Sequence, residues 1–168
     1  MGSDQIQLRA ADRETAAQEG DHLKLRLWLR ALTCIQMIET AIRARLRAEF
    51  DTTLPRFDVL AQLDAAKSPL TMGELSARLM VTSGSVTGLV DSMETDDLVE
   101  RKTHPADRRS TLISMTQRGR ALFDRMAPVH AGWVDELMAE LSPAEAATLH
   151  GLLGRLKHSV SAAGMGEP

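Results

Sequence analysis

Four short segments with different periodicities follow one another between residues 71 and 116, and their order constrains the fold more than any other feature. The stretch TMGE at 71–74 is typical of a capping box, which starts a helix. A second helical pattern covers 83–97, and the runs LVER (98–101) and TLISMT (111–116) are β-like. Two short helices separated by a tight turn and followed by a two-stranded hairpin predict a winged helix-turn-helix.

Long helical patterns flank this block. Apolar residues recur at three- to seven-residue intervals over 22–49, and a further helix begins near Thr53. After the hairpin, an apolar stripe starts at Gln117 and continues for about six turns, and Pro128 should kink it. The stretch SPAE at 142–145 is another capping box and begins a last helix. These patterns predict a mainly α fold with a small β-hairpin wing, in which a winged helix-turn-helix lobe joins a helical base.

The apolar stripes of the long helices predict a second copy of the chain as a partner. Each stripe is wider than a small winged helix can cover, and exposed apolar faces of this kind are usually buried through two-fold association. The expected organisation is a mobile N-terminal arm over 1–21, a helical dimerisation region over 22–52 and 117–161, a winged helix-turn-helix lobe over 53–116 and a C-terminal tail over 162–168.

The composition fits a domain without covalent cross-links. With 168 residues, of which 43% are hydrophobic, the chain can bury one core. No apolar run approaches the ~20 residues of a membrane span and the N-terminus lacks a signal-peptide pattern, so we expect a soluble, cytoplasmic protein. The single cysteine, Cys34, excludes an internal disulfide. Its apolar surroundings predict a buried small side chain, with a redox-sensing thiol as the alternative.

The basic charge of the chain is local. The formal net charge is −3, but residues 81–100 hold three Asp, two Glu and no Lys or Arg. Residues 101–120 hold six Lys or Arg and one Asp. The stretch THPADRRST at 103–111 lies in this basic block, and Pro105 stiffens a loop that is longer than a simple turn needs. A basic loop at the tip of a hairpin indicates a contact surface.

The stretch DRRSTLISMTQRG at 107–119 resembles the wing signature of the MarR family of winged-helix regulators. In that signature an Asp-x-Arg pair leads through an alternating strand to a Leu-Thr-x-x-Gly entry into a long helix. The matching residues are Asp107, Arg109, Thr116 and Gly119. Met115 stands where Leu is usual, which nearly conserves side-chain volume. Residues 70–102 are similar to the family's helix-turn-helix, and the order of elements fits over about 22–160.

This resemblance implies a homodimer whose terminal helices interleave and whose two lobes grip a pseudo-palindromic operator in double-stranded DNA. It also implies a pocket between base and lobe for a small aromatic or anionic effector, which releases the DNA. The stretch TLPRFDVLAQL at 53–63 resembles the branch that controls aromatic-acid (hydroxycinnamate-type) catabolism, in which some members respond to acyl-CoA thioesters. The resemblance therefore predicts a repressor released by an aromatic acid or its CoA thioester.

Residues 83–97 are the expected recognition helix, with its N-terminal end toward base edges in the major groove. Ser83, Ser85 and Thr87 face outward and can exchange hydrogen bonds with bases, although helix capping is the alternative role of the two serines. Many family members have Arg where this chain has Gly88, so direct readout should be modest. The acidic residues of the second half should point away from phosphates or pair with basic neighbours. These residues are Asp91, Glu94, Asp96 and Asp97.

The arginines of the hairpin loop are the predicted minor-groove contact. A narrow minor groove concentrates negative potential, so Arg109 should enter it while Arg108 contacts a phosphate. Asp107 should orient a neighbouring arginine through a charge-assisted pair. The alternative is that Arg109 only closes the hairpin through Asp107. Further candidates for backbone contact are Lys102, Arg101, Ser76 and Arg78.

The effector pocket should draw on aromatic and basic side chains of three helices. These residues are Trp28, Arg30, Arg56, His130 and Trp133. Arg56, beside Phe57 at a helix start, is the expected partner for an effector carboxylate or phosphate. For the two tryptophans the alternative role is packing in the core, and for His130 it is a surface or capping role.

The sequence contains no pattern typical of an enzyme. It lacks a Gly-rich phosphate loop and a His-Glu-x-x-His motif, and its five histidines lack close metal-ligand spacing. We therefore expect no catalytic residue, no metal, no cofactor and no membrane partner. Two alternatives stay open: a DNA-binding regulator triggered through Cys34, and a winged helix that binds protein rather than DNA.

Overall fold

The computed structural model describes residues 23–105, 107 and 109–163, except for the side chain of Ser83, and the chain divides into two units, 1–51 and 52–168. The predicted N-terminal arm and the end of the predicted tail, 164–168, lie outside the described residues. Two predicted DNA contacts, Arg108 and the Ser83 side chain, also lie outside them.

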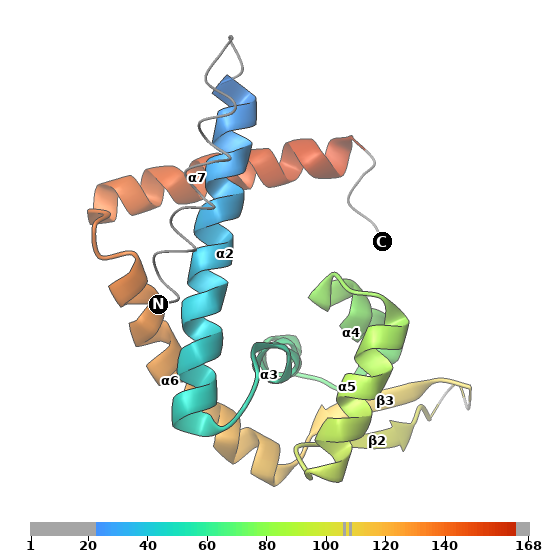
Figure 1. Ribbon diagram of the computed structural model, residues 1–168. Helices are drawn as coiled ribbons and strands as arrows, with labels where there is room; N and C mark the ends of the chain where they lie inside the picture. Colours follow the sequence, from blue (N-terminus) through green and yellow to red (C-terminus); the bar gives the residue numbers. More distant parts are fainter. Residues whose placement is uncertain (1–22, 106, 108, 164–168) are drawn as a thin grey trace. The chain divides into compact units, whose positions relative to one another are not determined.

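In the first unit the described residues form one helix, α2 (Leu23–Phe50), as the sequence predicts (Figure 1). Much of its apolar stripe is exposed in the single chain. The exposed residues are Leu23, Leu25, Leu27, Trp28, Ile35 and Met37. Cys34 is exposed as well, so the prediction of a buried cysteine is wrong. Ile35, the apolar neighbour that suggested burial, is itself 54% exposed.

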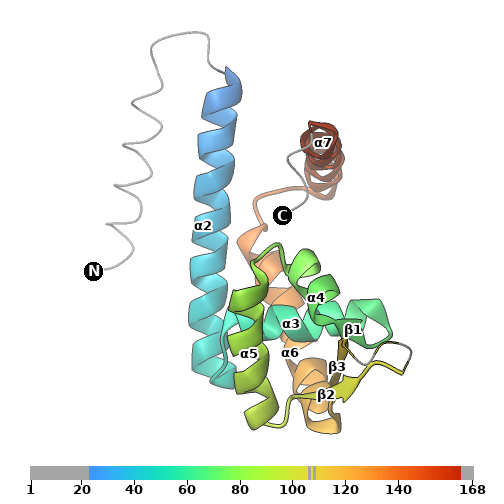
Figure 2. The ribbon, with the colours of Figure 1, turned by 90° about the vertical axis from the view of Figure 1, so that its right-hand side faces the viewer.

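The second unit contains the helix-turn-helix and the wing in the predicted order. The elements are α3 (Leu54–Ala66), β1 (Leu70–Thr71), α4 (Met72–Leu79), α5 (Ser83–Thr95), β2 (Val99–Thr103), β3 (Thr111–Met115), α6 (Gln117–Leu137) and α7 (Pro143–Ala162). Figure 1 shows α5 beside strand β2, and Figure 2 shows α3, α4 and α5 grouped together. The predicted mainly α fold with a small β wing is confirmed. Within the described part of the chain, no helix has both the length and the apolar character that crossing a bilayer requires.

The wing strands belong to a three-stranded antiparallel sheet of order β1-β3-β2. Leu70 pairs with Ile113 and Thr71 with Leu112, and β2 pairs with β3 along its whole length. Strand β1 was not predicted from the sequence, because two residues are too few to show an alternating pattern. Its second residue, Thr71, is also the N-cap of α4.

The predicted capping boxes are confirmed. The Thr71 hydroxyl accepts the Glu74 N–H at 3.2 Å, and the Glu74 carboxylate accepts the Thr71 N–H at 2.8 Å. Ser142 and Glu145 form the same arrangement at the start of α7. Each box satisfies backbone amides that a helix leaves unpaired at its N-terminus.

Pro128 lies inside α6, and the helix continues beyond it to Leu137.

The wing joins α6 through a close junction at Thr116 and Gly119. The Thr116 N–H donates to the Leu98 carbonyl at 3.2 Å, and the Thr116 hydroxyl donates to the Asp97 carbonyl at 2.6 Å. The same hydroxyl accepts the Gly119 N–H at 3.0 Å. A Cβ atom at Gly119 would lie 2.0 Å from the Leu98 carbonyl oxygen, so only glycine fits here.

A buried core fixes which face of α5 points outward. Val86, Val90 and Met93 of α5 are each 0% exposed. Burying side chains of this size stabilises a fold by about 1.5–3 kcal/mol each. Because these residues lie on one face of the helix, the opposite face is held toward solvent.

Candidate nucleic-acid interface

The N-terminal half of α5 presents small residues on its exposed face. Ser85 and Thr87 are exposed, and the hydroxyl oxygens of Ser85 and Thr82 lie 3.0 Å apart. A Cβ atom built on Gly84 or Gly88 would meet nothing within 4 Å. This face therefore admits close approach of a partner, but it offers no long side chain to read a base edge.

The acidic C-terminal half of α5 is paired with two arginines of neighbouring elements. Arg101 Nη1, from β2, lies 2.6 Å from Asp91 Oδ1 and 2.7 Å from Glu94 Oε2. Arg56, from α3, pairs with Asp96. Burial opposes the charge of Arg101, but its hydrogen bonds to the two carboxylates outweigh burial and raise the pKa of Arg101. The predicted pairing of acidic residues with basic neighbours is thus confirmed for three of the four carboxylates.

Lys102, predicted to contact the DNA backbone, has a partner within the wing. Its Nζ lies 2.5 Å from Glu100 Oε1, which also accepts the Ser114 hydroxyl at 3.1 Å. The hydrogen bond from Lys102, followed by that from Ser114, lowers the pKa of Glu100. Lys102 is 67% exposed. An exposed pair of this kind contributes about 0–1 kcal/mol, so a phosphate can compete for the ammonium group.

Hydrogen bonds hold the tip of the wing. The His104 N–H donates to the Ser110 carbonyl at 2.9 Å, and the Ser110 N–H donates to the Asp107 carbonyl at 3.0 Å. The Asp107 N–H donates to His104 Nδ1 at 3.2 Å, and Asp107 Oδ1 accepts the Arg109 N–H at 2.9 Å. Asp107 thus contacts Arg109 through the backbone amide rather than the guanidinium. Within the described residues, the Arg109 guanidinium makes no hydrogen bond or ion pair.

The two candidates on α4 differ in what they present. Ser76 is 6% exposed and its hydroxyl donates to the Gly73 carbonyl at 3.0 Å. Ser76 was predicted to contact a phosphate, and it lies next to Leu75 on the buried side of the helix. Arg78 is exposed in the last turn of α4 and stays a candidate.

The residues predicted to bind an effector fall in both units. Trp28, which is 60% exposed, and Arg30 lie on α2. In the second unit, the His130 ring stacks on Phe57 with centroids 4.4 Å apart and meets Trp133 edge-on at 6.4 Å. Burial lowers the pKa of His130, which favours the neutral imidazole. The role of Phe57 was missed because no local spacing links positions so far apart in the chain.

Arg56 has a partner within the protein. It was predicted to bind an effector carboxylate, but its guanidinium pairs with the carboxylate of Asp96 and donates to the Ser92 carbonyl at 3.4 Å. Its Nε is buried and has no hydrogen-bond partner among the residues that the structure describes. These contacts link α3 to the end of α5, a role that the sequence did not reveal.

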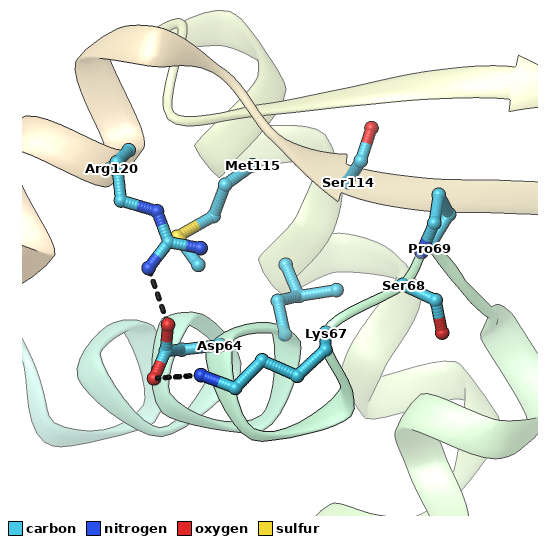
Figure 3. Close-up of a pocket in the computed structure, with 8 residues that line it drawn as sticks. Asp64, Lys67, Ser68, Pro69, Ser114, Met115 and Arg120 are labelled. Carbon is cyan, nitrogen blue, oxygen red and sulfur yellow. Dashed lines mark hydrogen bonds and ion pairs between the residues drawn. The ribbon is translucent and has the colours of Figure 1, made fainter.

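A cavity of about 450 Å³ opens elsewhere in the second unit (Figure 3). Its lining residues are Leu63, Asp64, Lys67, Ser68, Pro69, Ser114, Met115 and Arg120. The Asp64 carboxylate accepts a hydrogen bond from Arg120, which lowers the pKa of Asp64, and lies 4.0 Å from Lys67 Nζ. The cavity was not predicted because four separate segments line it. The described residues contain no cluster of His, Cys, Asp or Glu that could hold a metal ion.

Comparison with known proteins places these elements in a family. The sequence profile of the MarR family matches residues 50–110. BadR, a transcriptional activatory protein of Rhodopseudomonas palustris, is 31% identical over 83% of this chain and 82% of its own length. The regulator MhqR of Bacillus subtilis is 34% identical over a segment that covers 47% of this chain and 54% of MhqR. The chain therefore spans about half the length of MhqR.

A solved structure shares the fold and contains DNA. The crystal structure of a mutant MarR from E. coli complexed with operator DNA is similar with a TM-score of 0.71 and 28% identity, covering 82% of this chain and 99% of that one. The named relatives are transcriptional regulators, which agrees with the prediction that this chain is not an enzyme. From the wing, the helix-turn-helix and these similarities, we conclude that the chain belongs to the MarR family of winged-helix, DNA-binding transcriptional regulators.

Proposed function

We propose that this chain binds double-stranded operator DNA through its wing and the N-terminal half of α5. The observation that carries the proposal is the division of charge within the second unit. Arg56 and Arg101 pair with carboxylates of α5, whereas the guanidinium of Arg109 has no such partner among the described residues. An unmatched guanidinium on a narrow hairpin suits the minor groove, where negative potential is concentrated.

In this proposal the N-terminal end of α5 approaches base edges in the major groove. Ser83 and Ser85 supply hydroxyls, and the Thr87 methyl meets a thymine methyl. The proposed phosphate contacts are Arg78, Lys102 and Arg108. Because no long side chain extends from Gly88, the wing supplies a larger share of the grip than the helix.

The direct test is Arg109→Ala, measured by fluorescence anisotropy on the DNA upstream of the chain's own gene. We expect binding to weaken by about 1–3 kcal/mol, the scale of one good contact. Arg47→Ala, at a 70% exposed position of α2, is the control and should bind as the original chain does. An unchanged isotherm for Arg109→Ala at matched salt overturns the proposed grip. A chain that binds no DNA at all would instead fit a protein-interaction module.

We also propose that residues 22–52 and 117–161 form a homodimer with a second copy of the chain. None of the residues of α7 is buried in the single chain, although the helix is rich in leucine. Its exposed apolar residues are Leu149, Leu152, Leu153, Leu156 and Val160. In sedimentation experiments we expect the chain to be a dimer and Leu153→Glu to be a monomer. Lys157→Glu, on the same helix, should stay dimeric, and a monomeric original chain contradicts the proposal.

In the same proposal the chain is a repressor, and a small aromatic acid or its CoA thioester releases it from DNA. The support is the ring cluster of Phe57, His130 and Trp133, in which His130 is only partly buried and aromatic surfaces of this kind pack well against a further ring. Titrating hydroxycinnamic and benzoic acids and their CoA esters into the DNA complex tests the effector class. Since BadR is an activatory protein, a reporter gene tests the sign of regulation.

Two variants locate the effector if one of these compounds releases the DNA. His130→Ala should abolish release, whereas Lys67→Gln, at the rim of the separate cavity, should leave release intact. The reverse result would move the effector site to that cavity. If no compound of either class shifts the DNA complex, the effector proposal fails.

The exposure of Cys34 favours a second candidate trigger, oxidation of its thiol. Labelling the native chain with a thiol reagent should modify Cys34 quickly. If oxidation controls the protein, peroxide weakens DNA binding of the original chain but not of Cys34→Ser. Equal responses of the two chains exclude this trigger.

A further inference from the structure

One bond at the wing tip depends on the protonation state of a side chain. His104 Nδ1 accepts the Asp107 N–H at 3.2 Å. A neutral imidazole has one ring nitrogen that can accept a hydrogen bond, whereas both nitrogens of an imidazolium are donors. The bond between Asp107 and His104 therefore exists only while His104 is neutral.

This bond begins a series of contacts that ends at Arg109. Asp107, held by His104, in turn accepts the Arg109 N–H on its carboxylate at 2.9 Å and the Ser110 N–H on its carbonyl at 3.0 Å. The Ser110 carbonyl accepts the His104 N–H at 2.9 Å, which closes the set. Losing the first bond removes one of the three contacts of Asp107 and so weakens the restraint on the backbone that directs the Arg109 side chain.

We propose that neutral His104 is a positioning residue for DNA binding, which holds Asp107 so that Arg109 is aimed at the groove, and that protonation of His104 releases the wing tip. Among the described residues of the neighbouring elements, the Glu74 carboxylate of α4 interacts electrostatically with His104 and also with Arg78. An imidazolium is attracted to Glu74, which adds to the loss of the Asp107 contact. The inference rests on the proposed role of the wing in DNA binding.

The expected sign of the pH effect separates this account from a simple charge effect. Imidazoles change charge between about pH 8 and about pH 5. Added positive charge by itself strengthens binding to phosphates. Release of the wing tip instead weakens binding, so we expect the affinity for DNA to fall on acidification.

The experiment compares the full chain with three variants at the two ends of this pH range, using the DNA upstream of its own gene as the probe. His104→Asn keeps an acceptor oxygen on the carbon that carries Nδ1 but does not titrate, and His104→Leu removes the acceptor. His158→Asn, at an exposed position of α7, is the control. The original chain and His158→Asn should lose about three- to tenfold in affinity on acidification, the scale of one net hydrogen bond. His104→Asn should show no such loss, and His104→Leu should bind weakly at both pH values.

A second measurement follows the wing without DNA. In NMR spectra of the free chain, the amide signals of Asp107 and Arg109 should move with pH in the original chain and stay still in His104→Asn. If these amide signals do not change with pH, or change equally in the original chain and in His104→Asn, the role proposed for His104 is overturned while the proposed DNA grip is not. An affinity that rises on acidification, or falls equally in His104→Asn, overturns it as well. Unchanged DNA binding by Arg109→Ala would instead overturn the proposed DNA grip, whatever the amides show.

Discussion

The two regions proposed to meet DNA, α5 and the wing tip, differ in how they use charge. In α5 the carboxylates pair with arginines of the same unit, and the exposed N-terminal face carries hydroxyls and glycines. At the wing tip hydrogen bonds fix the backbone, and the Arg109 guanidinium has no partner among the described residues. The charges of α5 are thus paired within the same unit, whereas the charge of Arg109 is available to another molecule.

This difference explains how an acidic chain can present a basic contact. The net charge of −3 counts every residue equally. Paired charges a few ångströms apart largely cancel at longer range, and solvent screens exposed charges beyond about 8 Å at physiological salt. A partner at the wing therefore meets Arg109 and not the total charge of the chain.

The largest expected effect is on stability and comes from Gly119→Ala. This substitution disrupts the junction at Thr116 and Gly119, which joins both α5 and the wing to α6. The new methyl group would lie 2.0 Å from the Leu98 carbonyl oxygen. We expect the free energy of unfolding in urea to fall by about 3 kcal/mol, the upper end of overpacking effects. Gly88→Ala is the control, since its Cβ meets nothing within 4 Å and alanine favours a helix interior by up to about 1 kcal/mol. Similar losses in the two variants would contradict this role of Gly119.

Arg101→Ala tests whether the charges of α5 serve the fold. It leaves Asp91 and Glu94 unpaired, and we expect the free energy of unfolding to fall by about 1–2 kcal/mol, a value discounted because both carboxylates are partly exposed. DNA binding should also weaken, because two carboxylates on α5 lose their partner. Arg109→Ala should change the free energy of unfolding by less than about 0.5 kcal/mol. Equal destabilisation by the two variants in thermal and urea unfolding would remove the contrast between helix and wing.

Gly88→Arg should give the exposed face of α5 an unpaired arginine of the kind that the wing tip has in Arg109. The open space around Gly88 accommodates the new side chain, which can reach a guanine in the major groove. We expect binding to upstream DNA to strengthen by about 1 kcal/mol, measured by anisotropy against Gly88→Ala. If the arginine variant binds no better than the alanine variant, this face of α5 does not meet base edges.

The smallest effect is a pH dependence of stability that involves neither region. Burial lowers the pKa of His130 in the folded chain, so the unfolded chain binds the proton more readily. The stabilising contribution of neutral His130 is complete above about pH 6.5, the ordinary value, and is lost as pH falls through that value toward the lower folded one. His130→Phe should reduce this acid-dependent loss in urea unfolding, and Arg109→Ala should keep it. An unchanged profile for His130→Phe would assign the loss to other groups.

Much of the fold could be predicted because its signals are local. The capping residues at Thr71 and Ser142 lie three positions before their glutamates, and the wing strands alternate within five residues each. Strand β1 gave no such signal, because a two-residue strand depends on its partner β3 rather than on its own pattern. The exposure of Cys34 was not predictable either, since an apolar stripe does not reveal whether something in the same chain covers it.

For the candidate site, the sequence allowed us to predict which residues lie at the wing tip, but not which partners those residues contact. The sequence placed Arg109 and Asp107 at the wing tip, yet the use of His104 as an acceptor depends on how the loop closes. The acidic half of α5 was expected to pair with basic residues, but Arg56 was expected to bind an effector instead. Contacts between residues about 40 positions apart are set by packing, and no spacing in one sequence reveals them.

The junction at Thr116 and Gly119 has a mechanical consequence. One threonine hydroxyl contacts both the carbonyl that follows α5 and the first turn of α6, while its amide reaches the start of the wing. Hinge motion between these three elements would have to break those bonds and open the contact at Gly119. A displacement of α6 is therefore expected to move α5 and the wing together. In the proposed dimer, the adjustable quantity would be the spacing and tilt of the two lobes along the DNA.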